Sequence, residues 1–125
     1  MENKKIVLAI DDNPVQLRLF KEMLVPRYDL RAAKAASEAL SFLNTNAVDL
    51  ILLDIEMPNI SGFEFLDDIR KIPSYIGVPI IIVSGNSGAA FMEKARNSSA
   101  ASVLLKPVDP AVLVNTIEET LTASQ

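Results

Sequence analysis

Two adjacent carboxylates, Asp11 and Asp12, end a run of apolar residues near the start of the chain. Another carboxylate, Asp54, ends a later apolar run, and Ser84 and Lys106 follow two further runs at the same point. Together they supply three acids, one hydroxyl and one ammonium, a set suited to a hard cation and to phosphate oxygens. Because adjacent like charges repel each other, the Asp11–Asp12 pair indicates that a positive partner compensates for them.

The composition narrows the chemistry further. The 125 residues include no histidine and no cysteine, which removes the commonest general base, cysteine nucleophiles and thiolate metal sites. Carboxylate and carbonyl oxygens remain as metal ligands, and these favour Mg²⁺ over transition metals. The formal net charge of −4 argues against direct nucleic-acid binding, which usually needs a basic face.

Short apolar runs, mostly rich in Val, Ile and Leu, predict five strands. The runs are continuous rather than alternating, which is typical of strands buried on both faces of a parallel sheet. The predicted strands cover residues 5–10, 28–33, 49–53, 79–83 and 102–105.

Amphipathic segments between these runs predict five helices. Asn13 can cap the first, with Pro14 in its first turn, and Pro26 stops it. Ser61 can cap the third, and Asp109, followed by proline, begins the fifth. In the third helix Phe63, Leu66 and Ile69 are expected to face inward, and the second and fourth helices are predicted over residues 37–44 and 87–97.

Strict alternation of strands and helices predicts an α/β sheet covered on both faces, with right-handed crossovers. We expect residues 1–125 to form one domain, with no second domain. No signal-peptide pattern and no stretch long enough to span a bilayer is visible, so we expect no membrane association and a cytoplasmic location.

Functional groups of open α/β sheets gather at the carboxyl ends of the strands, so the polar residues after the runs should meet. Three close carboxylates cannot all stay ionised without positive partners, which a divalent cation and Lys106 would supply. Asp11 and Asp12 are therefore predicted to hold a metal. Asp54 could be a nucleophile toward phosphorus, with Ser84 and Lys106 binding the transferred oxygens.

The chain resembles a receiver domain of bacterial two-component signalling, similar to the single-domain chemotaxis response regulators. The segments that carry the resemblance are VLAIDDNP, LILLDIEMPNISGFEFL, PIIIVSG and VLLKPVD, in this order, and it covers about residues 4–122. It implies a doubly wound, flavodoxin-like fold with five parallel strands in the order 2-1-3-4-5 and five helices.

The resemblance also implies a metal site. Asp11 and Asp12 would be the acidic pair, with Asp12 the more direct Mg²⁺ ligand. Asp54 and the backbone carbonyl of Glu56 would complete the site.

Phosphoryl chemistry follows from the same resemblance. Asp54 would be the phosphoacceptor, receiving the group from a histidine kinase or a phosphotransfer protein. Ser84 would stand at the family's hydroxyl switch position, and Lys106 would pair with the phosphoryl group. The Lys106–Pro107 peptide bond would be cis. Such a domain catalyses only its own phosphorylation and dephosphorylation, and is otherwise no enzyme.

One departure from the family pattern concerns the read-out. Three residues before the lysine the family usually has Tyr or Phe, whereas this chain has Val103. Phosphorylation should still switch the face formed by the fourth helix, the fifth strand and the fifth helix, which an unknown output protein or domain would read. Ser99–Ala100 and Ser61 also differ from the usual residues, away from the phosphorylation chemistry.

Two other functions remain open at this point. A Mg²⁺-dependent phosphohydrolase with an aspartyl nucleophile would use similar groups, but the adjacent Asp11–Asp12 pair and the central Asp54 fit its pattern poorly. A phosphorylation-independent interaction domain is the other alternative, which the altered Val103 position supports in part.

Overall fold

A computed structural model describes residues 4–58 and 60–123 and confirms the predicted α/β architecture. Five parallel strands form one sheet in the order β2-β1-β3-β4-β5, as the resemblance implied. The strands are β1 Ile6–Ile10, β2 Asp29–Ala33, β3 Leu50–Asp54, β4 Ile80–Ser84 and β5 Ser102–Leu105.

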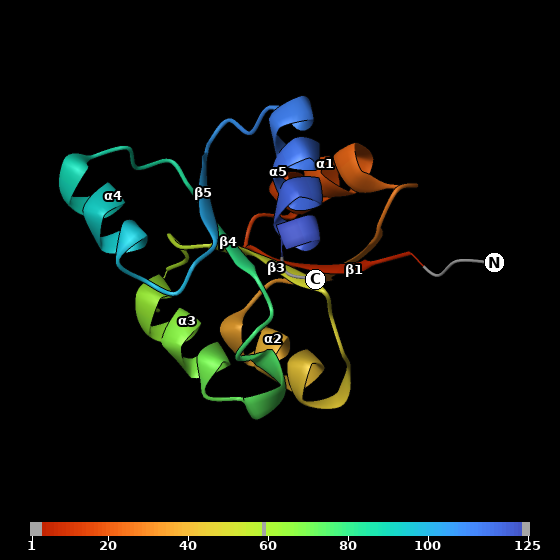
Figure 1. Cartoon of the computed structure of the whole chain (residues 1–125), viewed down its shortest axis with the longest axis horizontal. Coiled ribbons are helices and arrows are strands. Elements are labelled where there is room, and N and C mark those ends of the chain that lie inside the picture. Colours follow the sequence, from red (N-terminus) through yellow and green to blue (C-terminus); the bar gives the residue numbers. More distant parts are fainter. Residues whose placement is uncertain (1–3, 59, 124–125) are drawn as a thin grey trace.

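Helices cover both faces of this sheet (Figure 1). Helices α1 and α5 lie on one face, and α2 and α3 lie on the other. The helices are α1 Pro14–Leu24, α2 Ala36–Thr45, α3 Gly62–Arg70, α4 Ala89–Arg96 and α5 Pro110–Ala123. A 3₁₀ turn at Pro73–Tyr75, which the sequence patterns did not predict, precedes β4.

Burial of the strands follows their position in the sheet. Every residue of β3 and β4 is buried, as the continuous apolar runs predicted. The edge strands β2 and β5 are only partly buried. Apolar side chains on the two faces form two clusters, one beneath α1 and α5 and the other beneath α2, α3 and α4. The sheet is therefore anchored on both sides and fixes where its strand ends lie.

Side-chain caps begin three of the helices as predicted. Asn13 Oδ1 accepts a hydrogen bond from Val15 N at 2.9 Å, Ser61 Oγ from Glu64 N at 3.4 Å, and Asp109 Oδ2 from Val112 N at 3.0 Å. Each cap satisfies an amide of the first turn that has no partner within the helix. These caps fix the points at which the chain leaves the loops after β1 and β5 and before α3.

Helix α4 is shorter than the predicted 87–97, because its first expected residues form a turn instead. Asn86 Oδ1 accepts a hydrogen bond from Gly88 N at 2.8 Å, and the helix begins only at Ala89. Short polar side chains compete for backbone amides in this way and so favour turns. Helix α2 begins at Ala36, one residue before the predicted start.

The inward face of α3 also differs in one residue from the prediction. Leu66 and Ile69 are fully buried as expected, but Phe65 completes the core, whereas Phe63 is only half-buried. Phe65 shares a helix face with Ile69, four residues on, while Phe63 lies at the margin of that face. The Phe63 ring instead packs against Phe91 of α4, with centroids 5.8 Å apart.

Arg70 joins the C-terminal end of α3 to two loops at the opposite end of the sheet from the β1–α1 loop. Its guanidinium donates to the carbonyls of Tyr75 and Val78 at 2.7 and 2.5 Å, and to the hydroxyl and carbonyl oxygens of Ser99 at 3.0 and 3.1 Å. One side chain thus satisfies four acceptors in the loops before β4 and β5.

Gly62, the first residue of α3, packs so closely against Ile55 that a larger side chain there should lower the stability of the protein. A Cβ there would lie 2.5 Å from the Ile55 carbonyl oxygen and 2.6 Å from Ile55 Cδ1. We expect Gly62→Ala to lower the free energy of unfolding by about 1–3 kcal/mol through overpacking, measured by urea denaturation. Gly77, whose Cβ would meet nothing within 4 Å, is the matched control. Gly77→Ala should change stability by less than about 1 kcal/mol; equal effects of the two substitutions would contradict the prediction.

Candidate functional site

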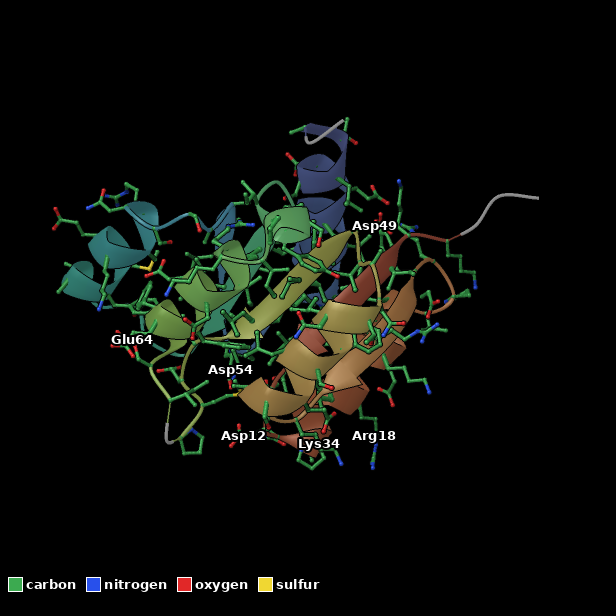
Figure 2. The ribbon with its side chains drawn as sticks, turned by 90° about the horizontal axis from the view of Figure 1, so that it is seen from below. Asp12, Arg18, Lys34, Asp49, Asp54 and Glu64 are labelled. Carbon is green, nitrogen blue, oxygen red and sulfur yellow. The ribbon has the colours of Figure 1, made fainter. Side chains whose placement is uncertain are left out.

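The predicted site residues lie at one end of the sheet because of the strand order and register. Ile10 pairs with Leu53, which places Asp11 beside Asp54 just past these partners. Ser84 ends β4 and pairs with Leu105, so that Lys106 follows directly. Figure 2 shows Asp12 and Asp54 toward the same end of the molecule, whereas Asp49, which precedes β3, lies at the other end.

The three carboxylates come together as the sequence predicted. One oxygen each of Asp11, Asp12 and Asp54 lies within 4.8 Å of the others. Asp11 is fully buried and Asp54 is 4% exposed, whereas Asp12 is exposed to solvent. Two ligands from the protein interior and one from its surface would leave a cation open to water on the outer side.

Lys106 supplies the positive charge nearest to these acids. Its Nζ lies 3.4 Å from Asp54 Oδ2 and 3.7 Å from Asp11 Oδ2. Lysine is a compact point charge, so one ammonium can neutralise only part of a cluster of three acids. The arrangement therefore retains an excess of negative charge.

Asp11 is the most constrained of the three acids. Its Oδ1 accepts a hydrogen bond from Asn13 N at 2.9 Å. Its Oδ2 is buried and has no hydrogen-bond partner among the described residues. Burial, with a smaller effect of the Asp54 charge, raises the pKa of Asp11 from 3.8 to about 6, against the opposing effects of Asn13 N–H and Lys106. A buried carboxylate oxygen without a donor fits a bound cation.

Asp54 is held by two different contacts. Its Oδ1 accepts a hydrogen bond from Glu56 N at 3.0 Å, while its Oδ2 faces Lys106. The chain turns immediately after β3, and this bond closes the turn. The carboxylate is therefore oriented by its own loop and by the end of β5.

The remaining predicted residues adjoin this group. Ser84 is fully buried, and its Oγ accepts a hydrogen bond from Asn86 N at 2.9 Å. The Lys106–Pro107 peptide bond is cis, as the resemblance implied. Val103 is partly buried and packs against the cluster beneath α3 and α4.

One contact of the site was not predicted from the sequence. The Glu56 side chain, expected to matter chiefly through its backbone carbonyl, accepts a hydrogen bond from Gly85 N at 2.6 Å through Oε1. It connects the loop after β3 to the loop after β4. Nothing in the sequence signals this contact, because the two residues are 29 positions apart and meet only when β3 and β4 pair.

Comparison with known proteins agrees with this geometry. Residues 7–118 match the family described as the response regulator receiver domain. The chain belongs to this family. It is a receiver domain of two-component signalling, with the α/β fold that the alternating pattern predicted.

Individual relatives are similar over most of this receiver domain. The sensor histidine kinase RcsC of Salmonella typhimurium is 32% identical over 113 residues, which are 90% of this chain and 12% of that protein. The two-component response regulator ARR18 of Arabidopsis thaliana is 35% identical over 112 residues, 87% of this chain and 17% of that protein. The chain thus spans only a small part of the length of these curated relatives.

Solved structures give the same fold. A CheY-like receiver domain protein of Methanospirillum hungatei is 28% identical with a TM-score of 0.88, covering 98% of this chain and 97% of that one. The chemotaxis response regulator CheY4 of Vibrio cholerae is 26% identical with a TM-score of 0.87, covering 94% of this chain and 99% of that one.

Among the described residues of the receiver domain, no helix is long and apolar enough to cross a membrane.

The raised pKa of Asp11 predicts how stability depends on pH in the absence of metal. The folded protein holds the Asp11 proton more tightly than the unfolded chain, whose pKa is near 3.8. This contribution to stability is complete below pH 3.8 and is lost as the pH rises to about 6. We expect Asp11→Asn to remove this loss and to raise the free energy of unfolding at neutral pH by about 1–3 kcal/mol in chelator.

Urea denaturation between acidic and neutral pH measures this effect. Asp67→Asn, at an exposed acid of α3, is the matched control and should follow the wild type. If Asp11→Asn were less stable than the wild type at neutral pH in chelator, the ionised Asp11 would be stabilising and the assignment would be wrong.

Proposed function

We propose that the protein is a phosphoacceptor switch that receives a phosphoryl group on Asp54. The observation that carries the proposal is the position of the Asp54 carboxylate, 3.4 Å from Lys106 Nζ and grouped with Asp11 and Asp12 at the strand ends. This is a nucleophile placed beside a cation and a pair of further acids. Membership of the receiver-domain family supports the same role.

With a phosphohistidine as donor, the transfer forms one bond to phosphorus and breaks another. An oxygen of Asp54 forms a bond to phosphorus as the bond from phosphorus to the imidazole nitrogen breaks. The departing nitrogen keeps the electron pair, and the product is an aspartyl phosphate and a free histidine on the partner. Reactions of this kind need positioning and charge neutralisation more than covalent chemistry from the protein.

Mg²⁺ fits the donor set of this site. Asp11, Asp12, Asp54 and the carbonyl of Glu56 would hold it, and the buried Asp11 Oδ2 accepts no hydrogen bond from the described residues. Bound there, Mg²⁺ would neutralise charge on the incoming phosphoryl oxygens.

Lys106 and Ser84 would bind the phosphoryl group after transfer. Lys106 Nζ already lies 3.4 Å from Asp54 Oδ2, close to where the phosphoryl group would be attached. The Ser84 hydroxyl accepts from Asn86 N, which leaves its own proton to donate to a phosphoryl oxygen. That contact would draw the loop after β4 toward Asp54.

The partners would be a histidine kinase or phosphotransfer protein as donor and an output protein or domain as reader, in the cytoplasm. The α4–β5–α5 face would be read, and Leu105 on β5 is 43% exposed there. We propose no direct contact with nucleic acid or membrane. The domain would act on its own aspartyl phosphate and not turn over other substrates.

Phosphorylation from a small donor tests the proposal directly. Incubation with acetyl phosphate and Mg²⁺ should add the mass of one phosphoryl group to the intact protein. Asp54→Ala should abolish the addition, because it removes the carboxylate proposed as the acceptor, whose Oδ2 lies 3.4 Å from Lys106 Nζ. Omission of Mg²⁺ should lower the yield by at least about tenfold, as expected for a lost charge-stabilising contact.

Asp67→Ala serves as the control for general loss of an acid and should be phosphorylated like the wild type. A folded wild-type protein that gained no mass would contradict the proposal and favour a phosphorylation-independent interaction domain. Turnover of an added phosphate ester would instead favour the phosphohydrolase.

Metal binding is predicted to appear separately as a gain in stability. Mg²⁺ at about ten times its dissociation constant should raise the free energy of unfolding by about 1–2 kcal/mol, because it binds only the folded cluster. Asp12→Asn should shrink this gain and Asp67→Asn should not. Equal Mg²⁺ effects in all three proteins, measured by urea denaturation, would place the ion elsewhere.

A further inference from the structure

Glu56 connects the candidate phosphoacceptor to the loop that follows β4. Its backbone N–H donates to Asp54 Oδ1 at 3.0 Å, and its carboxylate accepts from Gly85 N at 2.6 Å. The second bond is charge-assisted and short, which makes it stronger than an ordinary backbone bond. A single residue therefore touches both Asp54 and the amide directly after Ser84.

The loop it holds has few other anchors. Gly85 to Gly88 are exposed, and the hydrogen bonds found there are short-range ones, from Asn86 N to Ser84 Oγ and from Gly88 N to Asn86 Oδ1. Helix α4 begins directly after this loop and buries only Ala95. The Glu56 carboxylate is the contact that joins the loop to a neighbouring strand end.

The negative charge of the Glu56 carboxylate opposes phosphorylation of Asp54. Two further acids and one lysine already lie beside Asp54, and Glu56 brings another carboxylate to the same edge of the sheet. A phosphoryl group adds roughly two negative charges and oxygens that seek N–H donors. The Gly85 amide, next to Ser84, is a donor that both the carboxylate and a phosphoryl oxygen can use.

We propose that Glu56 is a positioning residue for phosphoryl transfer, whose carboxylate holds the Gly85 amide in the unmodified protein and gives it up when Asp54 carries phosphoryl. This inference rests on the proposed function. The carboxylate keeps the loop in its resting position and opposes the entry of an anionic phosphodonor. Its release frees residues 85–88, and with them the start of α4.

The contact between Glu56 and Gly85 could also transmit the phosphorylation signal to α4 in this chain, which has Val103 where the family usually has Tyr or Phe. Displacement of Glu56 acts on the loop through a hydrogen bond and needs no aromatic side chain. Movement at the start of α4 would next reach Phe91, which packs against Phe63 of α3. Lys94 of α4 also lies over the Phe63 ring, 4.7 Å from its centroid.

Three variants of the full chain test the proposal. Glu56→Gln keeps a hydrogen-bond acceptor but removes the charge, Glu56→Ala removes both, and Glu22→Gln makes the same charge change on an exposed residue of α1. The rate of phosphorylation by acetyl phosphate with Mg²⁺ is measured by intact mass at low and at high salt. The Gly85 amide proton resonance is recorded by NMR in the unmodified proteins.

We expect Glu56→Gln and Glu56→Ala to be phosphorylated about two- to fivefold faster than the wild type at low salt, the range for an exposed charge pair. The ratio should fall toward one at about 1 M salt, because screening weakens the repulsion. Glu56→Ala should also shift the Gly85 amide resonance upfield. Glu22→Gln should match the wild type throughout. A purely structural role for Glu56 would change stability but would produce no salt-dependent gain in rate.

Each of the other results would overturn the inference in a recognisable way. Equal rates in the wild type and both Glu56 variants, or an unmoved Gly85 resonance in Glu56→Ala, would exclude the positioning role while leaving Asp54 as the acceptor. A wild-type protein that takes up no phosphoryl group would overturn the proposed function, and this inference with it.

Discussion

Repulsion among three acids at one edge of the sheet is the constraint on which the site depends. Asp11 and Asp54 are buried beside each other, and Lys106 balances only part of their charge. Such an arrangement persists only where the surrounding structure is rigid enough to hold it. The fully buried strands β3 and β4, together with the helices on both faces, supply that rigidity.

That unfavourable charge gives the site its chemistry. A buried oxygen of Asp11 accepts no hydrogen bond within the described part of the chain, and this oxygen and the excess negative charge would both favour a bound cation. The same cation and Lys106 would lower the barrier to bringing an anionic phosphoryl group to Asp54. Binding of a cation would thus relieve the repulsion among the three acids.

The loops around the site are held less firmly than the sheet. Residues 85–88 are exposed and are held by Glu56 and by hydrogen bonds within the loop. The opposite end of the sheet is held by the partly buried guanidinium of Arg70. A rigid sheet with a loosely held loop at its functional end suits a switch, because a local change of charge can move the loop without disturbing the core.

The sequence by itself determined the element order, the parallel sheet, the three helix caps and the identity of the acids, because apolar periodicity and capping are local properties. It also predicted that Asp54 and Lys106 would meet, since strand ends must share an edge. Only the tertiary structure decided that Phe65 and not Phe63 joins the core, that Arg70 ties two loops, and that the Glu56 carboxylate reaches Gly85. These contacts join residues far apart in the chain, and their partners are fixed by how strands and helices pack, which no local pattern encodes.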